Sequence, residues 1–91
     1  MQALALPAVG TIPAHPTVLE RSAVPERING AAITPRQREV VALIADGLTD
    51  REMAATLSIG IETLKSHVRA IKLRTKARNR AHLVALAFRE T

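Results

Sequence analysis

Two helix-start patterns, TPRQ at residues 34–37 and TDRE at residues 49–52, constrain the fold of this 91-residue chain more than any other feature. In each, the threonine hydroxyl can accept a hydrogen bond from the backbone N–H three residues later, and the Gln or Glu there can return one to the threonine N–H. Pro35 suits the first position of a helix. The patterns predict helices over about Pro35–Asp46 and Asp50–Leu57.

Apolar residues after each start recur three or four positions apart, as on one face of a helix. Gly47 stands where a left-handed residue closes the first helix. The inward residues predicted by this spacing are Val40, Val41, Ile44 and Leu48 in the first helix, and Met53, Ala54 and Leu57 in the second.

Two further helices follow. Gly60 is a weaker cap for a third helix over about Ile61–Thr75, with Leu64, Val68 and Ile71 on its inner side. Asn79 caps a fourth helix over about Arg80–Arg89. We find no strand pattern, so the predicted fold class is all-α, a four-helix bundle.

Prolines set off the first part of the chain. Residues 1–30 hold Pro7, Pro13, Pro16 and Pro25 without helical or strand periodicity, so we predict a flexible Pro/Ala-rich N-terminal arm before a domain at residues 31–91. The opening MQALALPAVG lacks a basic region and is cut short by Pro7, so neither a signal peptide nor a membrane span is expected and a cytoplasmic location is predicted.

Composition excludes several classes of site. The chain has no cysteine, which rules out disulfides and thiolate chemistry, and a single aromatic residue, Phe88, which argues against stacking platforms for single-stranded nucleic acid. No paired acids, phosphate-cradling loop or metal-ligand spacing accompany His67 and His82. We therefore expect no enzyme activity, no cofactor and no metal.

Positive charge is concentrated in one segment. Residues 61–80 carry seven of the thirteen Lys and Arg residues but one of the eight acids. A short helix, a tight turn and a longer helix with a basic outer face are typical of a helix-turn-helix, whose second helix fits the DNA major groove. The predicted partner is double-stranded DNA, with base contacts from Lys65, Ser66, Arg69 and Glu62, and backbone contacts from Thr63, Lys72, Arg74, Lys76, Arg78 and Arg80.

The segment ITPRQREVVALIADGLTDREMAATLSIGIETLKSHVRAIKLRTKARNRAHLVALA resembles the LuxR/FixJ-type helix-turn-helix domain over about residues 33–87. The resemblance implies a four-helix output domain of a sequence-specific transcription regulator whose third helix reads bases at Lys65, Ser66 and Arg69. It adds His67 as a backbone contact. It also implies a homodimer formed through the fourth helix, for which we predict Leu83, Leu86 and Ala87 as the interface.

One departure from the family pattern concerns the end of the third helix. The family closes this helix with KLG, where this chain has Arg74, Thr75 and Lys76, so a core leucine and a capping glycine are both missing. We expect Leu73 to take over part of the packing and the helix to end irregularly.

Two alternatives stay open at this point. A sigma-factor region 4 module shares the style of the recognition helix and would also engage RNA polymerase, although the segment ARNRAHLVALA favours the LuxR side. A protein-interaction adaptor would use the apolar residues of the fourth helix to bind RNA polymerase or another regulator.

Overall fold

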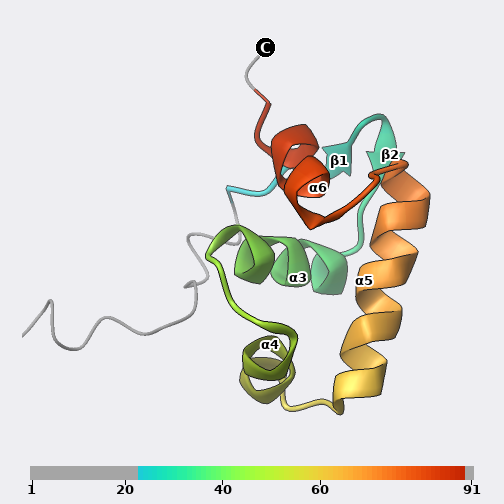
Figure 1. Cartoon of the computed structure of the whole chain (residues 1–91). Helices are drawn as coiled ribbons and strands as arrows, with labels where there is room; N and C mark the ends of the chain where they lie inside the picture. Colours follow the sequence, from blue (N-terminus) through green and yellow to red (C-terminus); the bar gives the residue numbers. More distant parts are fainter. Residues whose placement is uncertain (1–22, 90–91) are drawn as a thin grey trace, which may run out of the picture.

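The structure, a computed structural model, describes residues 23–89 (Figure 1). A short antiparallel hairpin comes first and four helices follow it. In chain order the elements are β1 (Arg27–Ile28), β2 (Ala31–Ala32), α3 (Pro35–Ala45), α4 (Asp50–Leu57), α5 (Ile61–Thr75) and α6 (Arg80–Ala87).

Both predicted capping boxes form. The Thr34 Oγ1 accepts from the Gln37 N–H at 3.1 Å and the Gln37 side chain accepts from the Thr34 N–H at 3.0 Å. Thr49 and Glu52 exchange the same two bonds at 3.1 and 2.8 Å. Each box satisfies two N–H groups that a helix start otherwise leaves unpaired, which fixes where α3 and α4 begin.

The helix ends differ slightly from the prediction. α3 ends at Ala45, and Gly47 follows with a φ of +87°, the left-handed conformation expected of it. α6 begins where predicted, because the Asn79 side chain accepts from the His82 N–H at 2.8 Å, but it ends at Ala87 instead of Arg89.

The core lies where α3, α4, α5 and α6 meet. Every predicted inward residue of the first three helices is buried except Leu57, which is partly buried against the core. The fully buried side chains come from all parts of the described chain: Val24, Ile28, Val40, Val41, Met53, Leu64, Ile71, Thr75 and Leu83. α5 packs against α3, α4 and α6 and forms one side of the molecule (Figure 1).

The hairpin corrects one expectation. Residues 27–32 form a pair of two-residue strands, with Arg27 opposite Ala32, so the absence of strands was wrong. Val24 and Ile28, which lie in the segment predicted to be a flexible arm, are buried in the core. The remainder of the predicted arm, residues 1–22, lies outside the described residues.

The end of α5 also corrects the prediction. Leu73 is 74% exposed and is not part of the core. Thr75 is fully buried at the position where the family has a leucine. The Thr75 hydroxyl donates to the Ile71 carbonyl at 2.8 Å, so its polar group is satisfied inside the core. The helix is regular through Thr75, and Lys76 adopts the left-handed conformation, with a φ of +64°, that a glycine adopts more easily.

Candidate nucleic-acid interface

α4, the turn at residues 58–60 and α5 form a helix-turn-helix. Ser58 turns the chain with a φ of +57°, and the Ile59 N–H donates back to the Ala54 carbonyl at 3.0 Å. Met53 and Ala54 of α4 and Leu64 of α5 are buried in the same core, and the two helices pack against each other. The longer helix is thereby held at the edge of the domain.

α5 has an apolar inner side and a polar outer side. Leu64, Val68, Ile71 and Thr75, at steps of four, three and four residues, are buried. Because 3.6 residues make a turn, the residues between them point away from the core. The predicted base-contact residues are all exposed on this outer side: Glu62, Lys65, Ser66 and Arg69.

Glu62, Ser66 and Arg69 follow one another at steps of four and three residues, so they share a stripe opposite the buried residues, and Lys65 flanks it. The structure thus brings the four predicted base-contact residues together on the first two and a half turns of α5. The stripe continues to Leu73.

The predicted backbone-contact residues divide into two groups. On α5, Thr63 is exposed and His67 and Lys72 are partly exposed, and Lys76 and Arg78, which follow the helix, are exposed. The other two, Arg74 and Arg80, donate hydrogen bonds to groups of the same protomer. The Arg74 Nε donates to the Ala32 carbonyl at 2.6 Å, and Arg80 donates to the Asp50 carboxylate at 2.5 Å and to the Leu48 carbonyl at 3.0 Å.

Sequence reasoning missed these structural roles of Arg74 and Arg80. The Arg80–Asp50 ion pair joins the start of α6 to the start of α4, with both side chains about one-third exposed. Nothing in local sequence spacing connects the two residues, because 30 positions separate them.

A groove of about 220 Å³ runs beside this ion pair, between the starts of α4 and α6 and the flank of α5. It is lined by Asp50, Lys65, Val68, Arg69, Lys72 and Arg80. Four of these six residues are cationic and one is acidic, so the groove carries net positive charge next to the outer side of α5.

The predicted dimer residues are not equally available to a second chain. Leu83 is fully buried and Ala87 is 5% exposed, both within the core of the protomer, so neither side chain lies on its surface. Leu86 is partly buried. The apolar residues of α6 that reach the surface are instead Ala81, Val84, Ala85 and Leu86, and Phe88, which follows the helix, is 39% exposed.

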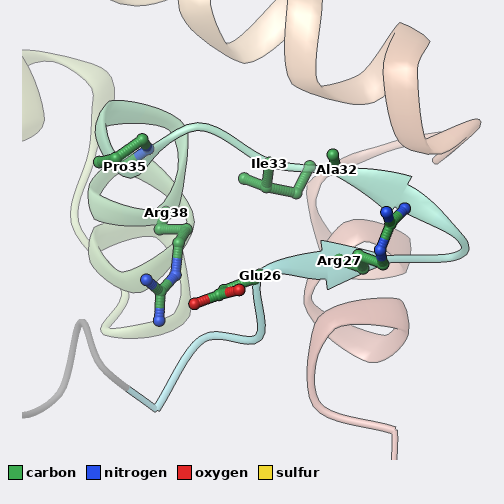
Figure 2. A pocket seen from close by; sticks show the side chains of 6 residues that line it. All are labelled: Glu26, Arg27, Ala32, Ile33, Pro35 and Arg38. Carbon is green, nitrogen blue, oxygen red and sulfur yellow. The ribbon is translucent and has the colours of Figure 1, made fainter.

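Two other cavities of the described residues lie away from the outer side of α5. One of about 260 Å³ lies between the end of α3 and the start of α6, and one of about 280 Å³ lies between the hairpin and the start of α3 (Figure 2). Residues 23–89 contain no cluster of three or more His, Asp or Glu side chains placed to hold a metal ion.

Over the same described range, each helix is too short or too polar to cross a membrane.

A short helix fixed against a longer one with an exposed cationic face defines a domain of the helix-turn-helix class. Comparison with protein families agrees: the family described as bacterial regulatory proteins, luxR family, matches residues 31–87, more than half of the chain. The chain therefore belongs to the luxR family of bacterial regulatory proteins.

Curated relatives match over the same region. The chain is 41% identical over 55 residues to a probable transcriptional regulator, ycf29, of Cyanophora paradoxa, covering 60% of this chain and 26% of that protein. It is 34% identical over 55 residues to a monoamine regulon transcriptional regulator of Klebsiella aerogenes, covering 60% and 24%. It is 36% identical over 56 residues to the response regulator protein VraR of Staphylococcus aureus, covering 62% and 27%.

The matched region spans about a quarter of the length of these relatives. No solved structure matches the chain.

Proposed function

We propose that this chain is a sequence-specific regulator of transcription that binds double-stranded DNA by inserting α5 into the major groove. The observation that carries the proposal is the division of α5 into a buried apolar side and an exposed side bearing Lys65, Ser66 and Arg69. A major groove about 12 Å wide admits one helix. A helix whose inner side is packed against the domain can present its outer side chains to base edges.

Each proposed base contact follows from the chemistry of the side chain. The Arg69 guanidinium can donate two parallel hydrogen bonds to guanine O6 and N7, and Lys65 can donate to the same atoms. The Glu62 carboxylate can accept from a cytosine amino group, and the Ser66 hydroxyl can donate or accept. Because these residues lie within the first turns of α5, they can address neighbouring base pairs.

Phosphate contacts are proposed for the residues that flank this stripe: Thr63, His67, Lys72, Lys76 and Arg78. Such contacts fix the orientation of the protein without reading sequence. For Arg74 and Arg80 we propose a supporting role, since both donate to groups of the same protomer. Their charges still lie beside the proposed DNA path and add to its positive potential.

We further propose a homodimer through α6. Support comes from the apolar side chains that α6 leaves partly uncovered, Val84 and Leu86, from Phe88 at 39% exposure, and from the adjacent groove between α3 and α6. Light scattering over micromolar concentrations tests this proposal. A protein mass equal to one chain at every concentration, both for the free protein and within its complex with DNA, would contradict it.

The main experiment is a selection of bound sites from random DNA duplexes, run at two salt concentrations. A sequence-specific binder enriches one motif at both concentrations, while overall binding falls at the higher salt. Binding without any enriched motif would contradict sequence specificity, and absence of binding to duplex at low salt would contradict the function as a whole.

The proposal also covers the cellular location of the chain and a second partner. Access to duplex DNA in a bacterial cell implies a cytoplasmic location. RNA polymerase would be a second partner of a transcription regulator, and a pull-down with polymerase core in the absence of DNA tests it. Capture under those conditions would favour the sigma-like or adaptor alternative over a role limited to DNA.

A further inference from the structure

The C-terminal end of α5 is tied to the hairpin by two hydrogen bonds. The Asn29 side-chain Nδ2 donates to the Thr75 carbonyl at 2.7 Å, and the Arg74 Nε donates to the Ala32 carbonyl at 2.6 Å. These bonds join residues 46 and 42 positions apart in the sequence. The hairpin therefore contacts the two last residues of the helix proposed to enter DNA.

The end of α5 needs such a partner. The last carbonyls of a helix have no intrahelical donor. The Lys76 and Ala77 N–H groups both donate to the Lys72 carbonyl, the Ala77 bond at 3.0 Å. The Asn29 amide supplies the donor for the Thr75 carbonyl, at a fully buried residue.

The hairpin is itself held firmly enough to act as a support. Asn29 and Gly30 both have positive φ, +53° and +84°, as in the tight turn that matches the twist of two antiparallel strands. Ile28 of β1 is buried in the core, and so is Val24, three residues before the hairpin. Arg38 of α3 donates from two nitrogens to the Val24 carbonyl, at 2.7 and 3.0 Å.

Figure 2 shows Arg38 on α3 beside Glu26 and the start of β1, across the cavity between these elements. The Ile33 N–H donates to the Glu26 carbonyl at 2.8 Å, which extends the pairing of the strands by one bond. The hairpin thus links α3 to the end of α5.

We propose that the hairpin at residues 27–32 is a positioning element for DNA recognition, and that the Asn29 side chain is the positioning residue through which it sets the angle of α5. The inference rests on the proposed function, because it assigns a role in DNA reading to a residue that touches no base. Residues 23–30 precede the segment that matches the luxR family, so the family match assigns them no role.

Asn29→Gly in the full chain tests the proposal. Glycine adopts the left-handed conformation of Asn29 readily, so the turn is kept while the amide donor is lost. Affinity is measured on the selected duplex and on a random duplex at a temperature where circular dichroism shows the chain folded. We expect the ratio of the two affinities to fall about fivefold, because an α5 without this bond must be ordered again when it reads bases, at a cost of about one neutral hydrogen bond.

Asn29→Asp is the second variant, in case glycine loosens the hairpin. Aspartate keeps the shape of the side chain and tolerates the left-handed conformation, but it offers an acceptor where the Thr75 carbonyl needs a donor. It should lower the same affinity ratio at least as much as Asn29→Gly.

Asn79→Gly is the matched control. It is the same substitution and removes a bond of similar length, from the His82 N–H, at the start of α6 instead of the end of α5. The affinity ratio should stay within about twofold of wild type, because a glycine N-cap costs little. An unchanged ratio in both folded Asn29 variants overturns the positioning role, and so does an equal fall in the control.

Hydrogen exchange without DNA separates this proposal from the proposed function. In both Asn29 variants the Lys76 and Ala77 amides should exchange at least about threefold faster relative to the Leu64 amide, because the end of α5 has lost a partner. If the wild-type chain binds no duplex, the proposed function fails, and the exchange result still tests the hairpin. Unchanged relative exchange would overturn the support that the hairpin gives to α5.

Discussion

Leu64 and Leu73 are the same residue type on the same helix, yet one is fully buried and the other is 74% exposed. Truncating a leucine in a small core removes its transfer free energy and leaves a cavity. Leu64→Ala should therefore lower the free energy of unfolding by about 2–5 kcal/mol, whereas Leu73→Ala should change it by less than about 0.5 kcal/mol. Urea unfolding of the two variants measures the difference, and similar losses would show that the register of α5 is wrong.

Lys76 combines a strained backbone with a charge that the proposal assigns to phosphate. At a φ of +64° the backbone of a residue with a side chain is less favourable in free energy than that of glycine. Lys76→Gly should therefore raise the free energy of unfolding by about 0.5–1 kcal/mol. The same substitution should weaken binding to every duplex alike, because it removes a charge and no base contact. Thermal unfolding and anisotropy on two duplexes test both halves, and a fall in stability would contradict the assigned conformation.

At the scale of elements, the sequence predicts the four helices and most of the register. The two capping boxes and the spacing of Leu64, Val68 and Ile71 are local signals, and local signals fix helix starts and faces. The prediction failed at the end of α5, where Leu73 was expected to pack and Thr75 is buried instead. Its hydroxyl bonds the carbonyl four residues earlier, so the residue can be buried as a small apolar side chain would be.

The hairpin was missed for a different reason. Strands of two residues are too short to show alternation, and the surrounding prolines favour an extended arm. The available signal was the Asn29–Gly30 pair, which favours a tight hairpin turn. Recognising it would have moved the start of the domain to include Val24 and Ile28.

The candidate site shows the same division between local and distant information. The exposed stripe of Lys65, Ser66 and Arg69 follows from helical spacing alone. The partners of Arg74 and Arg80 do not, because Ala32 and Asp50 lie 42 and 30 positions away in sequence. Only the folded chain reveals that these two cations are already bound.

At the scale of the whole molecule, the chain has a formal net charge of +5, and residues 61–80, in α5 and the start of α6, carry seven of its cations and one of its acids. Arg74 and Arg80 are bound internally, which leaves Lys65, Arg69, Lys72, Lys76 and Arg78 of the seven cations in residues 61–80 for the proposed DNA path. Counterion release then predicts a slope of about −4 to −5 per subunit in a plot of log affinity against log salt. A slope near zero would contradict the electrostatic part of the proposal.

The central claim is that the outer side of α5 reads base edges, and Arg69→Ala tests it most directly. On the selected duplex the substitution should cost about 1–3 kcal/mol and relax the preference at one base pair, while binding to random duplex changes much less. Lys76→Ala is the control and should weaken binding to both duplexes equally. Equal losses on both duplexes for Arg69→Ala would mean that Arg69 reads no base, and the account of recognition by this helix would be wrong.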